Sequence, residues 1–81
     1  MKVAVDISLY PLDENFIPPI KNVIKRLADH GDIEIEYNRM STQLRGDFEV
    51  VMSALTQEMR TTFEDVPKAV FAIKILNNPV T

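Results

Sequence analysis

The first segment of the chain, residues 2–10, alternates apolar and polar positions, as a half-buried β-strand does. Its apolar side comprises Val3, Val5, Ile7 and Leu9. Its other side carries Ala4, Asp6, Ser8 and Tyr10. Pro11 cannot donate to a sheet ladder, so we expect the strand to end there. The alternation predicts a sheet with one apolar face and one face that presents a row of polar groups.

The next segment repeats apolar residues at helical spacing. We expect a helix from about 15 to 29, with Asp13 or Asn15 as its cap and Gly31 at its natural stop. The pair Pro18–Pro19 fits only near the first turn of this helix. Its apolar stripe comprises Phe16, Ile20, Val23, Ile24 and Leu27.

Residues 33–45 predict a β-hairpin that turns near Asn38-Arg39. This register pairs Tyr37 with Met40, Ile35 with Thr42 and Ile33 with Leu44, all on the core side. The opposite side then carries Glu34, Glu36, Ser41, Gln43 and Arg45. A bulge or a shifted turn would invert part of this assignment.

A second helix is expected from about 48 to 62, with Asp47 as its cap. Its apolar stripe comprises Phe48, Val51, Met52, Leu55 and Met59, and we interpret Met40, Met52 and Met59 as core filler. Pro67 separates this helix from a last strand over residues 68–76. That strand places Phe71, Ile73 and Ile75 on one face and Val70, Ala72 and Lys74 on the other.

The element order is strand, helix, strand, strand, helix, strand. With right-handed crossovers, this order predicts an α+β fold, the ferredoxin-like βαββαβ plait, in which two helices cover one face of a four-stranded antiparallel sheet. The first and third strands are then central. The 81 residues suffice for one such domain, spanning 1–81.

The uncovered sheet face, called the open face below, mixes apolar and polar side chains. It comprises Ala4, Asp6, Ser8, Tyr10, Ser41, Gln43, Arg45, Val70, Ala72 and Lys74, with Glu34 and Glu36 at its edge. Such a face can be hydrated, can pack on another subunit or can hold a ligand. If it is buried, its polar groups must be paired, and Asp6 with Arg45 or Gln43 is a plausible structural pair.

Composition narrows the function classes. The net charge of −3 argues against nucleic acid, and we interpret Lys21, Lys25 and Arg26 as the solvated face of a helix. The N-terminus lacks the apolar core of a signal peptide, and no apolar run approaches the ~20 residues that cross a bilayer. The chain contains no Cys. We expect a cytoplasmic protein with no membrane partner.

Catalytic chemistry receives little support. The single histidine, His30, stands at a helix end, where we expect it to interact with the last carbonyls and the helix dipole. Neither a metal site of usual composition nor a glycine-rich phosphate loop is indicated. Asp6 with Glu34 or Glu36 could form an acid/base pair, although carboxylates on strands are common. We therefore expect no enzyme activity, no cofactor and no metal.

Three segments carry a family resemblance: ISLYPL at 7–12, NRMSTQLRGD at 38–47 and VPKAVFAIKI at 66–75. In this order and spacing they resemble the small thiamine-binding protein family, whose members bind thiamine or its hydroxymethylpyrimidine moiety. The likeness spans nearly the whole chain. It implies a ferredoxin-like domain that binds its ligand without catalysis. It also implies a homo-oligomer, a dimer or tetramer, since members either assemble from single domains or carry two such domains in one chain.

The ligand's chemistry defines candidate side chains. An aminopyrimidine needs carboxylate, amide or hydroxyl partners, and a thiazolium cation favours an aromatic face or a carboxylate. The candidates are Asp6, Ser8, Tyr10, Asn38, Ser41, Thr42 and Gln43. Asp6 would meet the amino group or the cation, and Tyr10 could stack. Structural roles stay open for each, such as Asn38 in a turn, Tyr10 in an interface and Thr42 as a strand former.

Arg45 departs from the resemblance, which leads us to expect an acidic or aromatic residue before the glycine that starts the second helix. A cation near the ligand would repel thiazolium, which favours the neutral pyrimidine or a phosphorylated form unless Asp6 neutralises Arg45. The first hypothesis is a non-catalytic protein that sequesters or delivers thiamine or hydroxymethylpyrimidine. The alternatives are an oligomeric interaction protein whose open face only mediates assembly, and an enzyme that uses Asp6 as an acid or base.

Overall fold

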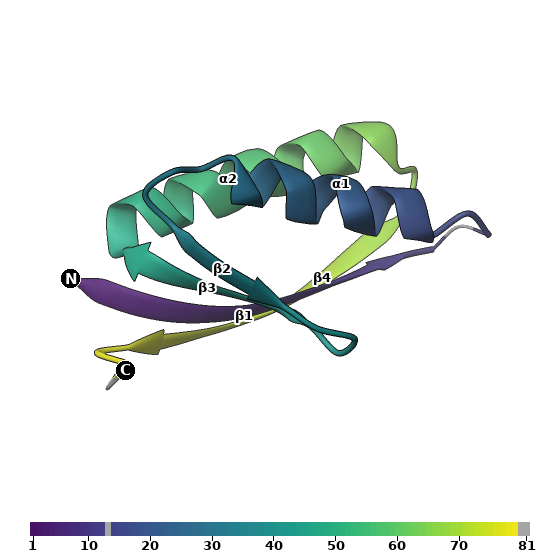
Figure 1. The fold of residues 1–81 in the computed structure, drawn as a ribbon. Coiled ribbons are helices and arrows are strands. Elements are labelled where there is room, and N and C mark those ends of the chain that lie inside the picture. The colour runs from purple at the N-terminus through teal and green to yellow at the C-terminus, as the bar shows by residue number, and fades with distance from the viewer. Residues whose placement is uncertain (13, 80–81) are drawn as a thin grey trace.

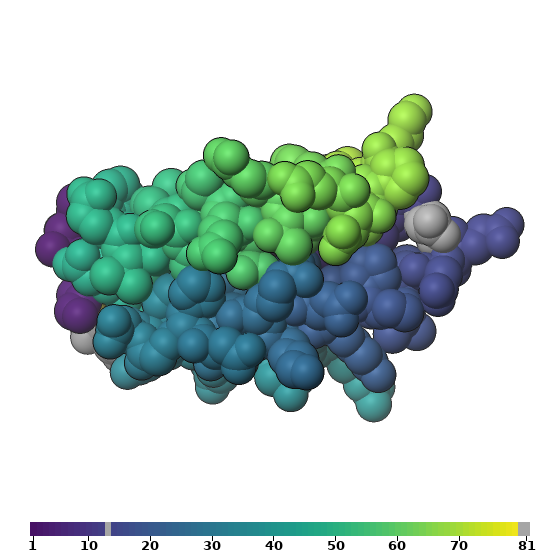
Figure 2. Space-filling view, turned by 90° about the horizontal axis from the view of Figure 1, so that it is seen from above, coloured from purple at the N-terminus to yellow at the C-terminus, as the bar shows by residue number. Residues whose placement is uncertain are grey.

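The computed structural model describes residues 1–12 and 14–79 and confirms the ferredoxin-like plait. The elements are β1 (Lys2–Pro11), α1 (Ile17–Ala28), β2 (Glu34–Tyr37), β3 (Thr42–Asp47), α2 (Phe48–Asp65) and β4 (Ala69–Asn77). Both helices cover the same face of the sheet (Figure 1), and they lie side by side above it (Figure 2). The strand order is β2-β3-β1-β4 and every neighbouring pair is antiparallel, so the first and third strands are central, as expected.

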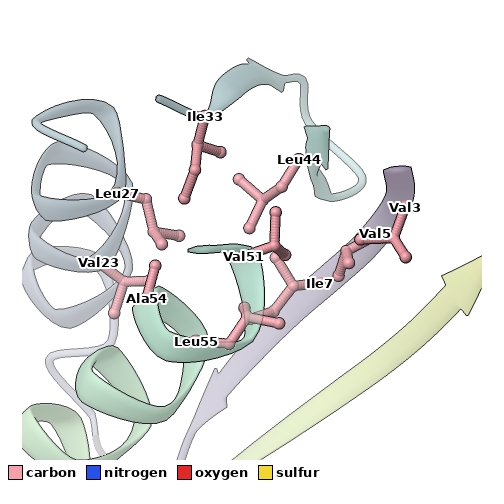
Figure 3. Packing of buried hydrophobic residues seen from close by; sticks show 10 residues of the cluster. All are labelled: Val3, Val5, Ile7, Val23, Leu27, Ile33, Leu44, Val51, Ala54 and Leu55. Atoms are coloured by element: carbon pink, nitrogen blue, oxygen red, sulfur yellow. The ribbon is translucent and has the colours of Figure 1, made fainter. Parts of the chain in front are cut away.

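The core lies between the sheet and the helices. The alternation of β1 holds, because Val3, Val5 and Ile7 are only 1–3% exposed. Apolar side chains of both helices point toward these strand residues (Figure 3). The buried cluster comprises Val3, Val5, Ile7, Val23, Leu27, Ile33, Leu44, Val51, Ala54 and Leu55. Met52 and Met59 pack partly buried against it, as predicted.

Helix α1 is shorter than expected and its ends differ from the prediction. It begins at Ile17, with Phe16 at the N-cap position and no side-chain cap within the described residues, so the prediction of an Asn15 cap is wrong. Asp13, the other predicted cap, lies outside the described residues. The proline pair lies in the first turn, as predicted. At the other end, the N–H of Asp29 donates to two carbonyls of the last turn.

The helix ends one residue before the predicted end at 29, but the predicted role of Gly31 in closing it is wrong. Helix α1 ends at Ala28, and Gly31 does not adopt the left-handed conformation of a glycine cap. The bifurcated bonds of the Asp29 N–H, each 3.2 Å long, already satisfy the carbonyls of Lys25 and Arg26. A glycine is therefore not needed to close this helix.

Helix α2 is capped as predicted and extends three residues beyond the predicted end. The side chain of Asp47 accepts a hydrogen bond from the N–H of Glu49 at 3.3 Å. The same side chain lies 3.3 Å from the N-terminal ammonium of Met1. The additional turn reaches Asp65 and is closed by the N–H of Val66, which donates to the carbonyl of Thr62 at 2.8 Å.

A polar cluster joins the two helices and corrects two expectations. Glu58 is 3% exposed and accepts a hydrogen bond from Nε of Arg26. Arg26 also donates to the hydroxyl of Thr62 at 3.3 Å, and Nε2 of His30 lies 3.7 Å from Oε2 of Glu58. Arg26 is therefore not part of a solvated face, and the His30 side chain approaches a carboxylate instead of the last helix carbonyls. A buried carboxylate needs such partners, because its desolvation is costly.

The β-hairpin is shifted by two residues from the predicted register. The structure pairs Ile35 with Leu44 and Tyr37 with Thr42, which leaves residues 38–41 as a four-residue loop. A shift of two residues preserves which face each strand residue occupies, so Leu44 and Thr42 are buried as predicted. Met40 falls in the loop and is 85% exposed, so its assignment to the core is wrong. Tyr37, at the end of an edge strand, is 65% exposed.

The hairpin offers a matched test of this packing. Leu44 is fully buried, whereas Met40 is exposed on the same hairpin. We expect Leu44→Ala to lower the free energy of unfolding by about 2–5 kcal/mol, because it leaves a cavity in the core. Met40→Ala should change it by less than about 0.5 kcal/mol. Urea unfolding followed by circular dichroism measures both values, and similar losses for the two variants would contradict the register.

Candidate ligand-binding site

Strand β1 extends well beyond the end of one of its two neighbours, β3. It pairs with β4 as far as Pro11, which lies opposite Ala69, but it pairs with β3 only as far as Ile7, opposite Thr42. Residues 8–11 therefore have a strand on one side only among the described residues. The end of β1, the 38–41 loop and the start of α1 lie at the same end of the molecule, away from the termini (Figure 1).

The free edge of β1 exposes main-chain hydrogen-bonding groups. The N–H of Leu12 donates to the carbonyl of Lys68 at 3.0 Å, so even-numbered residues of β1 direct their main chain toward β4. The main-chain groups of odd-numbered residues point to the opposite edge of β1, where the carbonyl of Met1 accepts a hydrogen bond from the N–H of Phe48. By this alternation, the N–H and carbonyl of Leu9 and the carbonyl of Pro11 point toward the free edge.

A cavity of about 470 Å³ lies at this free edge, and we call it the strand-end cavity. Its volume falls in the range of roughly 300–1,000 Å³ that is typical of small-molecule sites. The wall comprises residues 7–12 of β1 and its continuation, Phe16, Ile20, Val23 and Ile24 of the α1 region, residues 38–42, and Phe71 of β4. Large apolar side chains at the wall remain exposed, among them Leu12 at 63% and Phe16 at 50%. Exposed apolar groups gathered around a cavity are typical of a binding site.

The 38–41 loop, which forms one wall, is held by Asn38. Its Oδ1 accepts hydrogen bonds from the N–H of Met40 at 2.7 Å and of Ser41 at 3.1 Å. The main-chain N–H of Asn38 also donates to the carbonyl of Ser41 at 3.1 Å. Such local hydrogen bonds favour Asn in turns. They occupy the side-chain oxygen of Asn38 within the loop.

Asp6 reaches the cavity indirectly. The hydroxyl of Ser41, a wall residue, donates to Oδ1 of Asp6 at 2.6 Å. The short distance is typical of a hydroxyl bonded to a carboxylate. Since its proton is committed to Asp6, the Ser41 oxygen keeps lone pairs with which to accept a hydrogen bond from a ligand.

The structure brings five of the seven candidate residues to one cavity. These are Ser8, Tyr10, Asn38, Ser41 and Thr42. Asp6 and Gln43, which are cross-strand partners, line a smaller neighbouring groove of about 250 Å³ on the open face. Arg45 lines that neighbouring groove and not the strand-end cavity.

Sequence reasoning missed the apolar wall and one cation. Phe16, Ile20 and Ile24 belong to the apolar stripe of the helix, and this pattern predicts that they pack in the core. Arg39 is indicated by the sequence only as a residue of the hairpin turn. The signal that could have found them is the unequal length of the paired strands. Where the first strand extends beyond the hairpin, its apolar residues have no neighbouring strand to cover them.

Comparison with known proteins places the chain in a family. The model of the YKOF-related family matches residues 2–79. The chain belongs to the YKOF-related family. No curated protein shows significant similarity to it.

Solved structures share the fold of this YKOF-related protein. One is a Thermotoga maritima protein with a provisional role in thiamine biosynthesis or salvage, with a TM-score of 0.84, 23% identity and coverage of 93% of this chain and 82% of that one. A hypothetical protein from Methanocaldococcus jannascii gives a TM-score of 0.84 at 27% identity, covering 99% and 84%. A Streptococcus pneumoniae protein gives 0.78 at 18% identity, covering 99% and 90%.

Among the described residues of the YKOF-related protein, no helix combines the length and apolar character needed to cross a membrane.

The hydrogen bonds by which Asn38 holds the 38–41 loop of the cavity wall can be tested. We expect Asn38→Ala to lower the free energy of unfolding by about 1 kcal/mol, because the N–H groups of Met40 and Ser41 lose their acceptor. Amide hydrogen exchange should show faster exchange at these two positions. Arg39→Ala, one residue along, should leave both exchange rates unchanged. Unaltered protection in the Asn38 variant would contradict the assigned loop geometry.

Proposed function

We propose that this YKOF-related protein binds thiamine or its hydroxymethylpyrimidine moiety in the strand-end cavity and holds it without chemical conversion, so that it sequesters or delivers the ligand. The observation that carries the proposal is a cavity of about 470 Å³ whose wall combines apolar side chains with a few polar groups. The family membership, the resemblance of its sequence segments and the thiamine-related role provisionally given to the Thermotoga maritima relative support the same ligand class.

The cavity suits a flat heteroaromatic ring. Leu9, Phe16 and Phe71 supply apolar and aromatic surface for the ring faces, and Tyr10 stands at the rim, 54% exposed. An aminopyrimidine presents an amino donor beside a ring-nitrogen acceptor. The main chain of Leu9 offers the complementary pair, a carbonyl acceptor and an N–H donor, on the free edge of β1. An extended strand edge therefore recognises such a ring in the way that it recognises another strand.

Ser41 and Asp6 add a second polar contact. With its proton donated to Asp6, the Ser41 hydroxyl oxygen can accept from the ligand's amino group. The negative charge of Asp6, one hydrogen bond behind the wall, strengthens that acceptor. Asp6 therefore serves the site through Ser41, although it lines the neighbouring groove.

Calorimetric titration with hydroxymethylpyrimidine and with thiamine tests this function. Wild-type protein should bind at least one of them saturably, and mass spectrometry should recover the ligand unchanged. Ser41→Ala should weaken binding about two- to tenfold, because one hydrogen bond is lost.

Gln43→Ala, in the neighbouring groove and exposed, is the matched control and should bind like wild type. An absence of binding by folded wild-type protein would refute the proposed function, and a converted product would refute binding without catalysis.

Self-association through the open face is the second part of the proposal. Tyr10, Val70 and Leu76 are 54%, 49% and 58% exposed there, on strand pairs Tyr10–Val70 and Ala4–Leu76. Burying such side chains against a second copy would remove apolar surface from water.

We expect sedimentation equilibrium to give the mass of a dimer or tetramer, and Val70→Lys to lower that mass by placing a charge in the contact. Ala28→Lys, exposed on α1 across the sheet, is the control and should leave the mass unchanged. A monomeric wild-type protein would exclude assembly through this face.

A further inference from the structure

The described residues that line the strand-end cavity carry one formal charge, and it is positive. That charge belongs to Arg39, in the 38–41 loop. Its side chain is exposed and makes no hydrogen bond or ion pair with the described residues. A guanidinium without an acidic partner, placed at a cavity wall, is available to an anionic ligand.

The loop holds Arg39 at a defined position. The Oδ1 of Asn38 binds the N–H groups of Met40 and Ser41, so hydrogen bonds fix the backbone on both sides of Arg39. The guanidinium therefore extends from an ordered base, which lowers the conformational entropy lost when it binds a ligand.

We infer that the strand-end cavity prefers a phosphate monoester of the aminopyrimidine ligand, with Arg39 as the phosphate-binding residue. This inference rests on the proposed function, since it specifies the form of the ligand for the same site. A guanidinium pairs with phosphate through two parallel hydrogen bonds, whereas it repels the thiazolium cation of thiamine.

The charges around the cavity also orient such a ligand. The carboxylate of Asp6, behind Ser41, attracts the amino group and repels the phosphate. Helix α1 contributes Phe16, its N-cap residue, to the wall, and its first turn contains no acidic side chain among the described residues. The amino end of a helix carries a partial positive charge, which adds to the field of Arg39. The ring is therefore expected to bind toward Ser41 with the phosphate toward Arg39.

Arg45 provides a matched control within the same chain. The sequence alone made Arg45 the cation of interest, but the structure places it in the neighbouring groove with Ala4 and Lys74. The two arginines carry the same charge and both are exposed. Of these two arginines, Arg39 lines the strand-end cavity and Arg45 does not.

The experiment compares hydroxymethylpyrimidine with its monophosphate by titration calorimetry, using wild type, Arg39→Gln and Arg45→Gln. Wild-type protein should bind the monophosphate about tenfold more tightly, as one charge-assisted contact predicts. Arg39→Gln should abolish that preference and change the affinity for the unphosphorylated compound by less than about twofold. Arg45→Gln should keep the preference. Raising the salt concentration should reduce the preference of the wild type.

The outcomes separate the two proposals. If the wild type binds both compounds equally, or if Arg45→Gln loses the preference while Arg39→Gln keeps it, the phosphate inference is overturned and the proposed function stands. If a folded wild type binds neither compound nor thiamine, the proposed function fails and this inference fails with it. Circular dichroism confirms that each variant is folded.

Discussion

Strand β1 has two neighbours of unequal length, and the rest of the structure follows from that constraint. It pairs with β3 over six residues and with β4 over nine. Over residues 3–7, β1 is paired along both edges, and its apolar side chains are buried at the centre of the core. Beyond Ile7 it keeps only β4, so an apolar, partly paired segment continues past the end of β3. That segment creates the strand-end cavity, and its free main-chain groups give the cavity its polarity.

The helices keep this cavity in shape. Helix α1 contributes Val23 both to the core and to the cavity wall, so its position relative to the sheet determines both. The buried Glu58 of α2, bonded to Arg26 of α1, fixes the two helices against each other. A buried ion pair adds little net stability compared with apolar packing, but it is costly to break, and it thereby specifies one arrangement. The open face, in contrast, has no layer above it among the described residues.

Much of the fold could be predicted because alternation and helical spacing are strong local signals. The inward face of β1 and the Asp47 cap are examples, since each depends on neighbouring residues alone. The hairpin register could not be predicted, because a four-residue loop held by the Asn38 side chain is as compatible with the sequence as a tight turn. The candidate residues came from ligand chemistry and resemblance. The positions of Arg39 and of the apolar wall at one cavity depend on how far β1 extends beyond β3. That difference in length cannot be predicted from any local sequence pattern.

The most direct test of this account is to locate the ligand on the protein. Two-dimensional ¹H–¹⁵N NMR of the labelled protein, titrated with hydroxymethylpyrimidine, reports which amides change. We expect the shifted signals to belong to residues 8–10 and 38–42, with Leu9 among the largest because its N–H faces the cavity. Shifts confined to Ala4, Lys74 and Leu76 would place the ligand in the neighbouring groove and contradict the proposed site, and so would a spectrum that does not change.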